Sequence, residues 1–181
     1  MATPAYTAAR ERAAFLDRST RGRLAVSGAD RASYLQGLLT NDIAALRPGL
    51  GCYAAYLTAQ GRMIADLWVY ELGDAMLVAL HGDVKDAVLA RLDQFIFGED
   101  VKLGDVTATF VEVAVVGPGA AAVVSRVLEE VPGGALAALP EHGNRRGRRA
   151  ACSPARADGG RKFHLCSCHR VPYRRFARRD R

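Results

Sequence analysis

Residues 51–80 read GCYAAYLTAQGRMIADLWVYELGDAMLVAL, and this stretch decides the fold. It contains apolar runs that predict three strands, over residues 51–57, 62–72 and 75–80. The connections 58–61 and 73–74 are short enough to form hairpins. Because strands joined by hairpins run in opposite directions, the stretch predicts a mostly antiparallel sheet.

A strand and a helix are expected before this stretch. Residues 22–26 have the composition of a short strand, and Ser27 or Gly28 would then open an amphipathic helix. The apolar positions at helical spacing are Tyr34, Leu35, Leu38 and Leu39. We expect this helix to pack on the sheet.

A second helix, further strands and a third helix are expected after the stretch. Asp83 has the side chain of an N-cap, and the helix that it begins should end near Gly98. Its apolar stripe is Val84, Val88, Leu92 and Phe95 or Ile96. Two strands and a third helix follow, over residues 101–106, 109–116 and 120–131. This order predicts an α+β fold, a mostly antiparallel sheet with flanking helices.

The charge of the chain is divided unevenly. Residues 1–142 hold 12 Lys/Arg and 17 Asp/Glu, a net charge of −5, whereas residues 143–181 hold 13 Lys/Arg and 2 Asp/Glu, a net charge of +11. The second part has no hydrophobic period and cannot offset an ordering entropy of about 1–2 kcal/mol per residue. We therefore predict a folded domain over 1–142 and a disordered basic tail over 143–181. The tail would contact nucleic acid only nonspecifically, through phosphates.

The location predicted from the sequence is the cytoplasm. The N-terminal segment has no apolar signal-peptide region, and no run of about 18 apolar residues predicts a membrane span. Cys52 stands alone in the folded part, as expected in a reducing compartment. We read it as a buried strand cysteine.

The segment 24–118 resembles the folate-binding YgfZ family and its relative, the glycine-cleavage T-protein (aminomethyltransferase). The opening block of the resemblance is VSGADR with YLQGLLTNDI, at residues 26–31 and 34–43. The later blocks are YAAYLTAQGRMIAD at 53–66, RLDQFIFGEDV at 91–101 and VGP at 116–118. Each block alone is weak, but four in the right order are fairly specific.

The resemblance implies a fold that holds tetrahydrofolate in a cavity between domains. T-proteins move a methylene unit onto tetrahydrofolate, whereas YgfZ-like proteins support the assembly or repair of iron–sulfur proteins and tRNA modification. The leading expectation is a folate-binding YgfZ-like accessory protein, incomplete here, with iron–sulfur proteins as partners. One alternative is an aminomethyltransferase, and another is an interaction domain that binds no folate.

Two departures from the family patterns bear on this choice. The resemblance to T-proteins implies two adjacent acids where this chain has Ala65 and Asp66, which weakens the expectation of an enzyme. The YgfZ signature Lys-Gly-Cys-Tyr-x-Gly-Gln-Glu is also missing. The triplet Gly51-Cys52-Tyr53 imitates part of it but matches an early strand of the family instead.

Asp66 is the residue most strongly expected to face a ligand. On an alternating strand, Ile64, Asp66, Trp68 and Tyr70 share one face, opposite Met63, Ala65, Leu67 and Val69. A carboxylate among apolar neighbours needs a hydrogen-bonding partner, which folate amines could supply while Trp68 and Tyr70 pack on flat rings. The competing interpretation is a sheet residue satisfied by local backbone or an arginine, with both aromatic side chains in the core.

Three further residues are expected to contribute to folate binding. The resemblance places Asn41 and Asp42 in the cavity wall, although loop residues of these types commonly bond local backbone. Arg62, on the hairpin turn, could pair with the glutamate tail of a folate, or could be an ordinary surface arginine. Gly61 before it is expected to adopt a positive φ.

The tail contains side chains that superficially suggest a metal site, namely Cys152, His164, Cys166, Cys168 and His169. Their spacing fits a structural zinc site poorly, so we expect no metal. We also hypothesise that residues from about Gly143 onward are translated out of frame, because the resemblance stops before them and their composition changes abruptly. Translation of the other two reading frames tests this. A genuine basic interaction tail is the competing interpretation.

Overall fold

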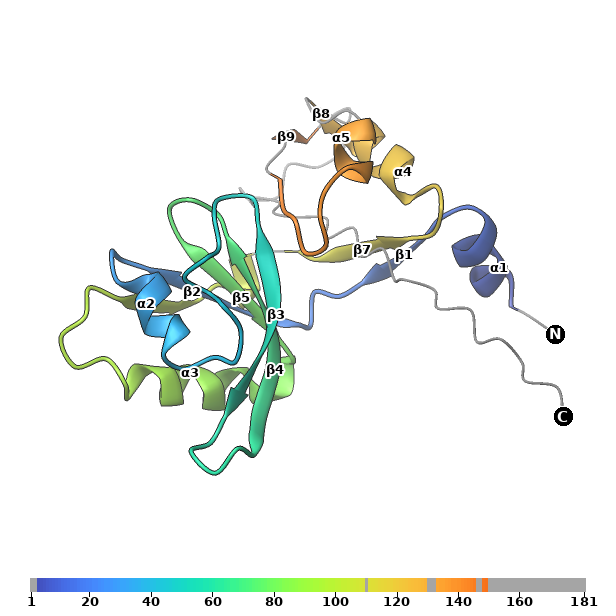
Figure 1. The fold of residues 1–181 in the computed structure, drawn as a ribbon. Coiled ribbons are helices and arrows are strands. Elements are labelled where there is room, and N and C mark those ends of the chain that lie inside the picture. Colours follow the sequence, from blue (N-terminus) through green and yellow to red (C-terminus); the bar gives the residue numbers. More distant parts are fainter. Residues whose placement is uncertain (1–2, 110, 130–132, 146–147, 150–181) are drawn as a thin grey trace, which may run out of the picture.

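A five-stranded antiparallel sheet forms the centre of the structure, a computed structural model that describes residues 3–109, 111–129, 133–145 and 148–149 (Figure 1). The strands are β2 Gly22–Ser27, β3 Gly51–Leu57, β4 Met63–Glu71, β5 Met76–Leu80 and β6 Lys102–Asp105. They follow the order β3-β4-β5-β2-β6, and every neighbouring pair is antiparallel. The predicted α+β fold is confirmed, and the strands of the 51–80 stretch lie side by side as expected.

Two helices, α2 Arg31–Gln36 and α3 Lys85–Asp93, cover one face of this sheet (Figure 1). The core between them contains inward-facing side chains of the strands and of both helices, including Leu24, Leu35, Leu67, Val78, Leu80, Val88 and Leu92. Fully burying a side chain of this kind stabilises the fold by about 1.5–3 kcal/mol. This face is therefore the main source of stability in the sheet.

The first covering helix begins later than the sequence predicts. Gly28 has a φ of 109°, and a Cβ on it would lie 1.9 Å from the carbonyl oxygen of Asp100. The backbone N–H of Asp100 donates to Oδ2 of Asp30 at 2.9 Å, and the N–H of Asp30 donates to the Asp100 carbonyl at 3.2 Å. This close contact between two loops delays the start of α2 to Arg31.

The prediction that Asp83 caps the second helix is wrong. Asp83 lies in the short 3-10 turn η1 Gly82–Val84, and the N-cap of α3 is Val84, which makes no side-chain cap bond. The helix ends at Asp93 and not near Gly98, so Phe95 is exposed to solvent. The middle of the predicted stripe is confirmed by the burial of Val88 and Leu92.

A smaller region is built on the two-stranded sheet of β1 Ala14–Asp17 and β7 Val113–Val116 (Figure 1). Around it lie α1 Pro4–Glu11, α4 Ala120–Val127, α5 Gly133–Ala137, and the pair β8 Leu128–Glu129 and β9 Arg148–Arg149. Its small core consists of Val115, Ala120, Val124 and Leu136, with partly buried apolar neighbours. Because this core is so small, the region depends on its junction with the central sheet.

The sequence predicts this region less accurately. The expected strand over 109–116 is shorter, because the 3-10 turn η2 Thr107–Thr109 precedes β7. The expected helix over 120–131 ends at Val127, because Leu128 has extended dihedral angles of −104° and 118°. Neither α1 nor β1 was predicted from the sequence.

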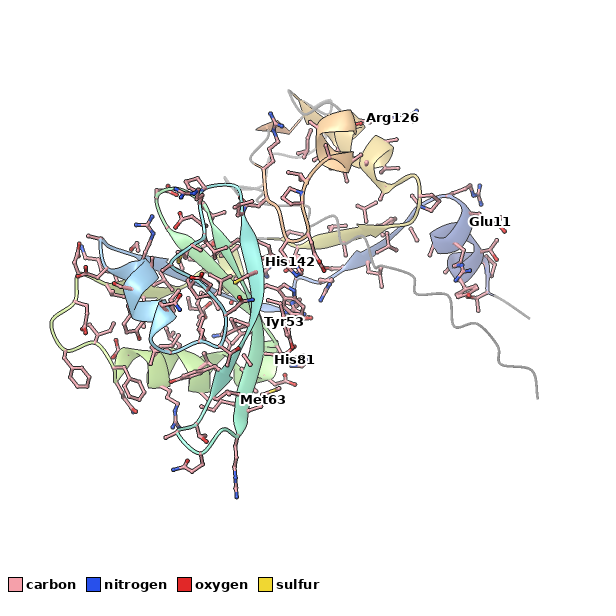
Figure 2. The ribbon with its side chains drawn as sticks, viewed as in Figure 1. Glu11, Tyr53, Met63, His81, Arg126 and His142 are labelled. Carbon is pink, nitrogen blue, oxygen red and sulfur yellow. The ribbon has the colours of Figure 1, made fainter. Side chains whose placement is uncertain are left out.

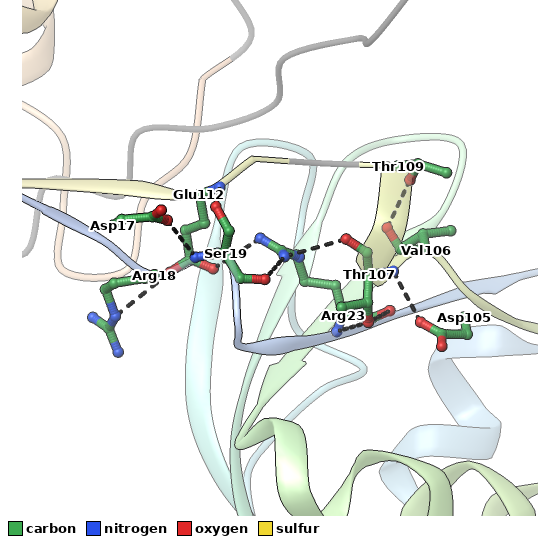
Figure 3. Close-up of polar contacts among 9 residues, drawn as sticks. All are labelled: Asp17, Arg18, Ser19, Arg23, Asp105, Val106, Thr107, Thr109 and Glu112. Carbon is green, nitrogen blue, oxygen red and sulfur yellow. Dashed lines mark hydrogen bonds and ion pairs between the residues drawn. The ribbon is translucent and has the colours of Figure 1, made fainter.

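A buried arginine joins the two regions (Figure 3). The Arg23 guanidinium donates to the carbonyl oxygens of Ser19 at 2.8 Å and Thr107 at 3.3 Å, and forms an ion pair with Glu112 at 3.4 Å. The backbone N–H of Arg18 donates to the Glu112 carbonyl at 2.8 Å. These bonds hold the chain before β2 against the chain before β7.

A second connection is made by Asn144, which is buried. Its backbone N–H donates to the Gly49 carbonyl at 2.8 Å, and its side-chain amide donates to the carbonyls of Leu50 at 2.9 Å and Glu71 at 3.3 Å. The segment around Asn144 therefore returns to the ends of β3 and β4. The boundary between 142 and 143 stays a prediction, and residues 150–181 of the expected tail lie outside the described residues.

Within the described ranges, no helix combines the length and the apolar character that a membrane span requires.

Candidate functional site

Successive side chains of β4 point to opposite faces of the central sheet. Ala65, Leu67 and Val69 are buried in the helix-covered core, whereas Asp66 and Trp68 are half-buried on the opposite face. This part of the predicted alternation is confirmed. The sheet therefore presents a carboxylate and an indole away from its main core.

The alternation fails at the start of β4. The register with β3 shifts between Tyr56 and Leu57, which leaves an extra residue on β4. As a result, Ile64 packs against the helix-covered core and Met63 is 65% exposed, the reverse of the sequence expectation. The bulge separates the regular part of the strand, which carries Asp66, from the hairpin tip.

Asp66 lies within a cluster of aromatic side chains. Tyr53 on β3 pairs with Trp68 on β4, and their ring centroids are 5.2 Å apart with an edge-to-face angle of 62°. The Tyr53 hydroxyl donates a hydrogen bond to Oδ2 of Asp66 at 3.4 Å. Figure 2 shows Tyr53 on the side of β3 turned away from α2, and Met63 nearer the hairpin.

An arginine lies on the indole. The guanidinium carbon of Arg21 is 4.5 Å from the centroid of the Trp68 ring, a cation–π contact. Arg21 directly precedes β2 and lies two residues before Arg23, so the two side chains point to the same face of the sheet. Arg23 is paired across the strands with Ala79, and Ala79 with Trp68, so this is the face that carries the indole. We call Arg21, Tyr53, Asp66, Trp68 and Tyr70 the aromatic face.

The aromatic face combines flat rings with a carboxylate, groups that can pack on a flat molecule and accept hydrogen bonds from N–H groups. Within the described part of the chain, Tyr53 is the one hydrogen-bond donor to Asp66, so the carboxylate retains most of its acceptor capacity. Partial burial, and then the charge of Asp66, raise the pKa of Tyr53. Its hydroxyl therefore keeps its proton at neutral pH and acts as a donor.

Tyr70 lies at the closed end of this face. It is only 5% exposed and packs with Leu77 and Ala79 in a small apolar cluster. A Cβ added to Gly51 would lie 2.6 Å from the Tyr70 ring and 2.7 Å from the His142 carbonyl, so backbone closes over this end. Tyr70 thus supports the face from within, while Trp68 and Asp66 are nearer its surface.

Asn41 and Asp42 lie beside the aromatic face, at the outer edge of β3. The Asn41 side-chain amide donates to the Tyr53 carbonyl at 2.7 Å, and its oxygen accepts from the Asp42 N–H at 2.7 Å. Oδ1 of Asp42 accepts from the backbone of Ala45 at 3.1 Å. Both side chains are exposed and engaged with local backbone, and Asn41 holds the strand that carries Tyr53.

Arg62 is separate from the other predicted site residues. It lies exposed on the β3–β4 hairpin, after Gly61, whose φ of 78° confirms the predicted positive value. Cys52 lies on β3 as expected but is only partly buried, because β3 is an edge strand. Burial, and then the charge of Asp42, raise the pKa of its thiol.

Two members of the aromatic face, Tyr53 and Arg21, were missed by sequence reasoning. Tyr53 could have been found, because the hairpin connection 58–61 sets the register that places it opposite Trp68. Arg21 could not, because its position depends on β2 pairing with β5, which no local signal in the sequence predicts.

Within the described residues, no group of three or more His, Cys, Asp or Glu side chains could hold a metal ion. The histidines and cysteines of the tail considered above lie outside those residues.

Comparisons with known proteins agree with the fold. The family model described as GCVT N-terminal domain matches residues 3–139. The chain is 33% identical over 125 residues to an aminomethyltransferase of Geobacillus kaustophilus (strain HTA426), covering 68% of this chain and 34% of that protein. It is also 33% identical over 125 residues to an aminomethyltransferase of Bacillus subtilis (strain 168), with the same coverage of 68% and 34%.

A solved structure gives the same result. The glycine cleavage system aminomethyltransferase T from Bartonella henselae matches with a TM-score of 0.61 and 26% identity, covering 66% of this chain and 33% of that one. The chain thus spans about a third of the length of the curated relatives that it matches, at 34% of the first of them. The expected relationship to the T-protein is confirmed, and the chain belongs to the GCVT N-terminal domain family.

Proposed function

We propose that this chain binds tetrahydrofolate on its aromatic face, as part of a protein of the aminomethyltransferase type. The observation that carries the proposal is the half-buried Asp66 carboxylate, which has one long hydrogen bond from the described residues and lies beside the paired rings of Tyr53 and Trp68. The matched aminomethyltransferases support the same assignment.

The donor set of this face suits a folate. Asp66 would accept hydrogen bonds from folate amines, and the partly exposed rings of Tyr53 and Trp68 would pack against its flat groups. When bound, tetrahydrofolate would supply the amine that takes up a one-carbon unit. A fixed carboxylate would stabilise positive charge developing on that amine. We propose that Asn41 and Asp42 act at the rim of the site and that Tyr70 supports it from within.

Titration of tetrahydrofolate into the full chain tests this proposal. We expect saturable binding that Asp66→Asn weakens about tenfold or more, because a charge-assisted hydrogen bond contributes about 1.5–3 kcal/mol. The matched control is Asp93→Asn, which changes an exposed acid at the end of α3, on the helix-covered side. Equal affinity of Asp66→Asn and the control would remove Asp66 from the site, and no binding by the unmodified chain would overturn the proposal.

A second candidate is the YgfZ-like accessory role, in support of iron–sulfur protein assembly or repair and tRNA modification. The observation that favours it is Ala65, which is buried in the helix-covered core while Asp66 faces the other way. Because the two side chains point to opposite faces, Asp66 cannot take the place of the second acid that T-proteins are expected to carry at position 65. Transfer of a methylene unit to bound tetrahydrofolate would favour the transferase, and binding without transfer would favour the accessory role. A cytoplasmic location is part of both proposals.

A further inference from the structure

Arg21 differs from the arginines around it. Arg18 and Arg23 both pair with Glu112, at 3.7 Å and 3.4 Å. Arg31, the first residue of α2, pairs with Glu71 at 3.2 Å. Within the described ranges, Arg21 has no ion pair, and its guanidinium makes a cation–π contact with the ring of Trp68. An arginine on the aromatic face therefore has hydrogen-bond donors for which the described residues supply no acceptor.

The surroundings of Arg21 raise the free-energy cost of leaving its guanidinium N–H groups without an acceptor. The side chain is half-buried, and loss of water, followed by the like charge of Arg18, lowers its pKa. Glu112, Tyr70 and Asp66 act in the opposite direction but more weakly. The guanidinium nevertheless remains charged at any physiological pH, because arginine keeps its proton in proteins. Partial desolvation of a charged group without an ion pair costs free energy, and pairing with an incoming anion would lower that cost.

Arg21 is also held in position before any ligand arrives. Its backbone N–H donates to the Arg18 carbonyl at 2.9 Å, which closes a tight turn. The Arg18 N–H in turn donates to the Glu112 carbonyl, and the Ser19 N–H donates to Asp17 at 2.8 Å (Figure 3). A planar guanidinium that is already oriented loses less entropy on binding a carboxylate than a free surface arginine.

We propose that Arg21 is the anion-binding residue of the aromatic face and pairs with a carboxylate of the glutamate portion of a folate. This rests on the proposed function. It assigns to Arg21 the role that the sequence suggested for Arg62, which lies exposed on the hairpin and outside the aromatic face. Trp68 then serves two purposes, as a ring that contacts the ligand and as a platform that orients the guanidinium.

The test compares two ligands on the full chain. Tetrahydrofolate carries the glutamate carboxylates, and tetrahydropteroate, used as its primary amide so that the benzoate carboxylate is capped, is the same ring system without any carboxylate. We expect the unmodified chain to bind tetrahydrofolate more tightly, and Arg21→Gln to lose about tenfold to a hundredfold in affinity for tetrahydrofolate while its affinity for tetrahydropteroate is unchanged. Arg62→Gln is the matched control and should bind both ligands as the unmodified chain does.

Each outcome decides a different point. Unchanged binding of tetrahydropteroate would show that Arg21→Gln is folded. Arg21→Lys should recover only part of the lost affinity for tetrahydrofolate, because an ammonium group lacks the planar fork of a guanidinium. Equal affinity of the unmodified chain for the two ligands, or equal loss for both in Arg21→Gln, would overturn the role of Arg21 and leave the proposed function standing. Failure of the unmodified chain to bind either ligand would overturn both.

Discussion

The two faces of the central sheet differ in what their side chains do. On the helix-covered face, Leu24, Leu67 and Leu80 are fully buried among apolar neighbours. On the opposite face, Asp66 and Trp68 are only half-buried. Both faces are built from the same strands, so neighbouring residues in the sequence serve different purposes.

This difference shows how the domain separates stability from binding. Deep burial of apolar groups supplies free energy of folding and tolerates few changes of volume. The half-buried Asp66 carboxylate and the Arg21 guanidinium, which has no ion pair in the described part of the chain, should supply little, because their interactions would be completed only by the proposed ligand. Substitutions in the helix-covered core should therefore alter unfolding, whereas substitutions of Asp66 and Arg21 on the second face should alter ligand affinity.

Adjacent residues of β4 give the largest test of this comparison. Leu67 is 1% exposed in the centre of the sheet, so Leu67→Ala should lower the free energy of unfolding by about 2–5 kcal/mol through lost burial and a residual cavity. Asp66→Ala, one residue earlier on the opposite face, should change it by less than about 1 kcal/mol. Urea denaturation of both variants measures the difference, and equal losses would mean that the two faces are not distinct.

The arginines on the second face allow a smaller test. Arg23 is 3% exposed, and its guanidinium serves two carbonyls and Glu112, so Arg23→Met should destabilise the fold by about 1–3 kcal/mol by leaving those acceptors unsatisfied. Arg21→Met removes the cation–π contact with Trp68 and should lower the free energy of unfolding by about 0.5–1 kcal/mol. Thermal unfolding of the two variants checks this, and a larger loss for Arg21→Met would show that Arg21 is a structural residue.

The sequence predicts the covered face better than the aromatic face, for a physical reason. Burial in the core depends on local alternation, so the strands of the 51–80 stretch and the positions of Leu67 and Val69 can be predicted from the pattern. The bulge that exposes Met63 cannot be predicted from this pattern, because it depends on how β3 and β4 close their hairpin.

The candidate site also combines local and distant contributions. Asp66 and Trp68 were predicted from one strand, and Tyr53 lies one hairpin away from them. Arg21 reaches Trp68 only because β2 pairs with β5, and the turn that holds it is anchored by Glu112, far along the chain. Only the parts of the site that lie within one hairpin could be predicted from sequence periodicity.

The smallest predicted effect concerns the rim of the covered face, where Lys85 on α3 pairs with Asp105 on β6 at 2.6 Å. The hydrogen bond from Lys85, followed by one from Thr107, lowers the pKa of Asp105 from 3.8 to about 2. Because the folded state holds the proton more weakly than the unfolded state, the pair stabilises the fold above about pH 4, and this contribution disappears as the pH falls toward 2.

Lys85→Met should therefore lower the free energy of unfolding at pH 7 only slightly, since Asp105 is partly exposed and solvent screens the pair. Urea denaturation at several pH values should show the gap between the variant and the unmodified chain narrowing below pH 4. Lys102→Met, an exposed lysine on β6, is the matched control. A gap that stays constant with pH would mean that Lys85 acts through packing against Gly22, where its side chain leaves no room for a Cβ, and not through its charge.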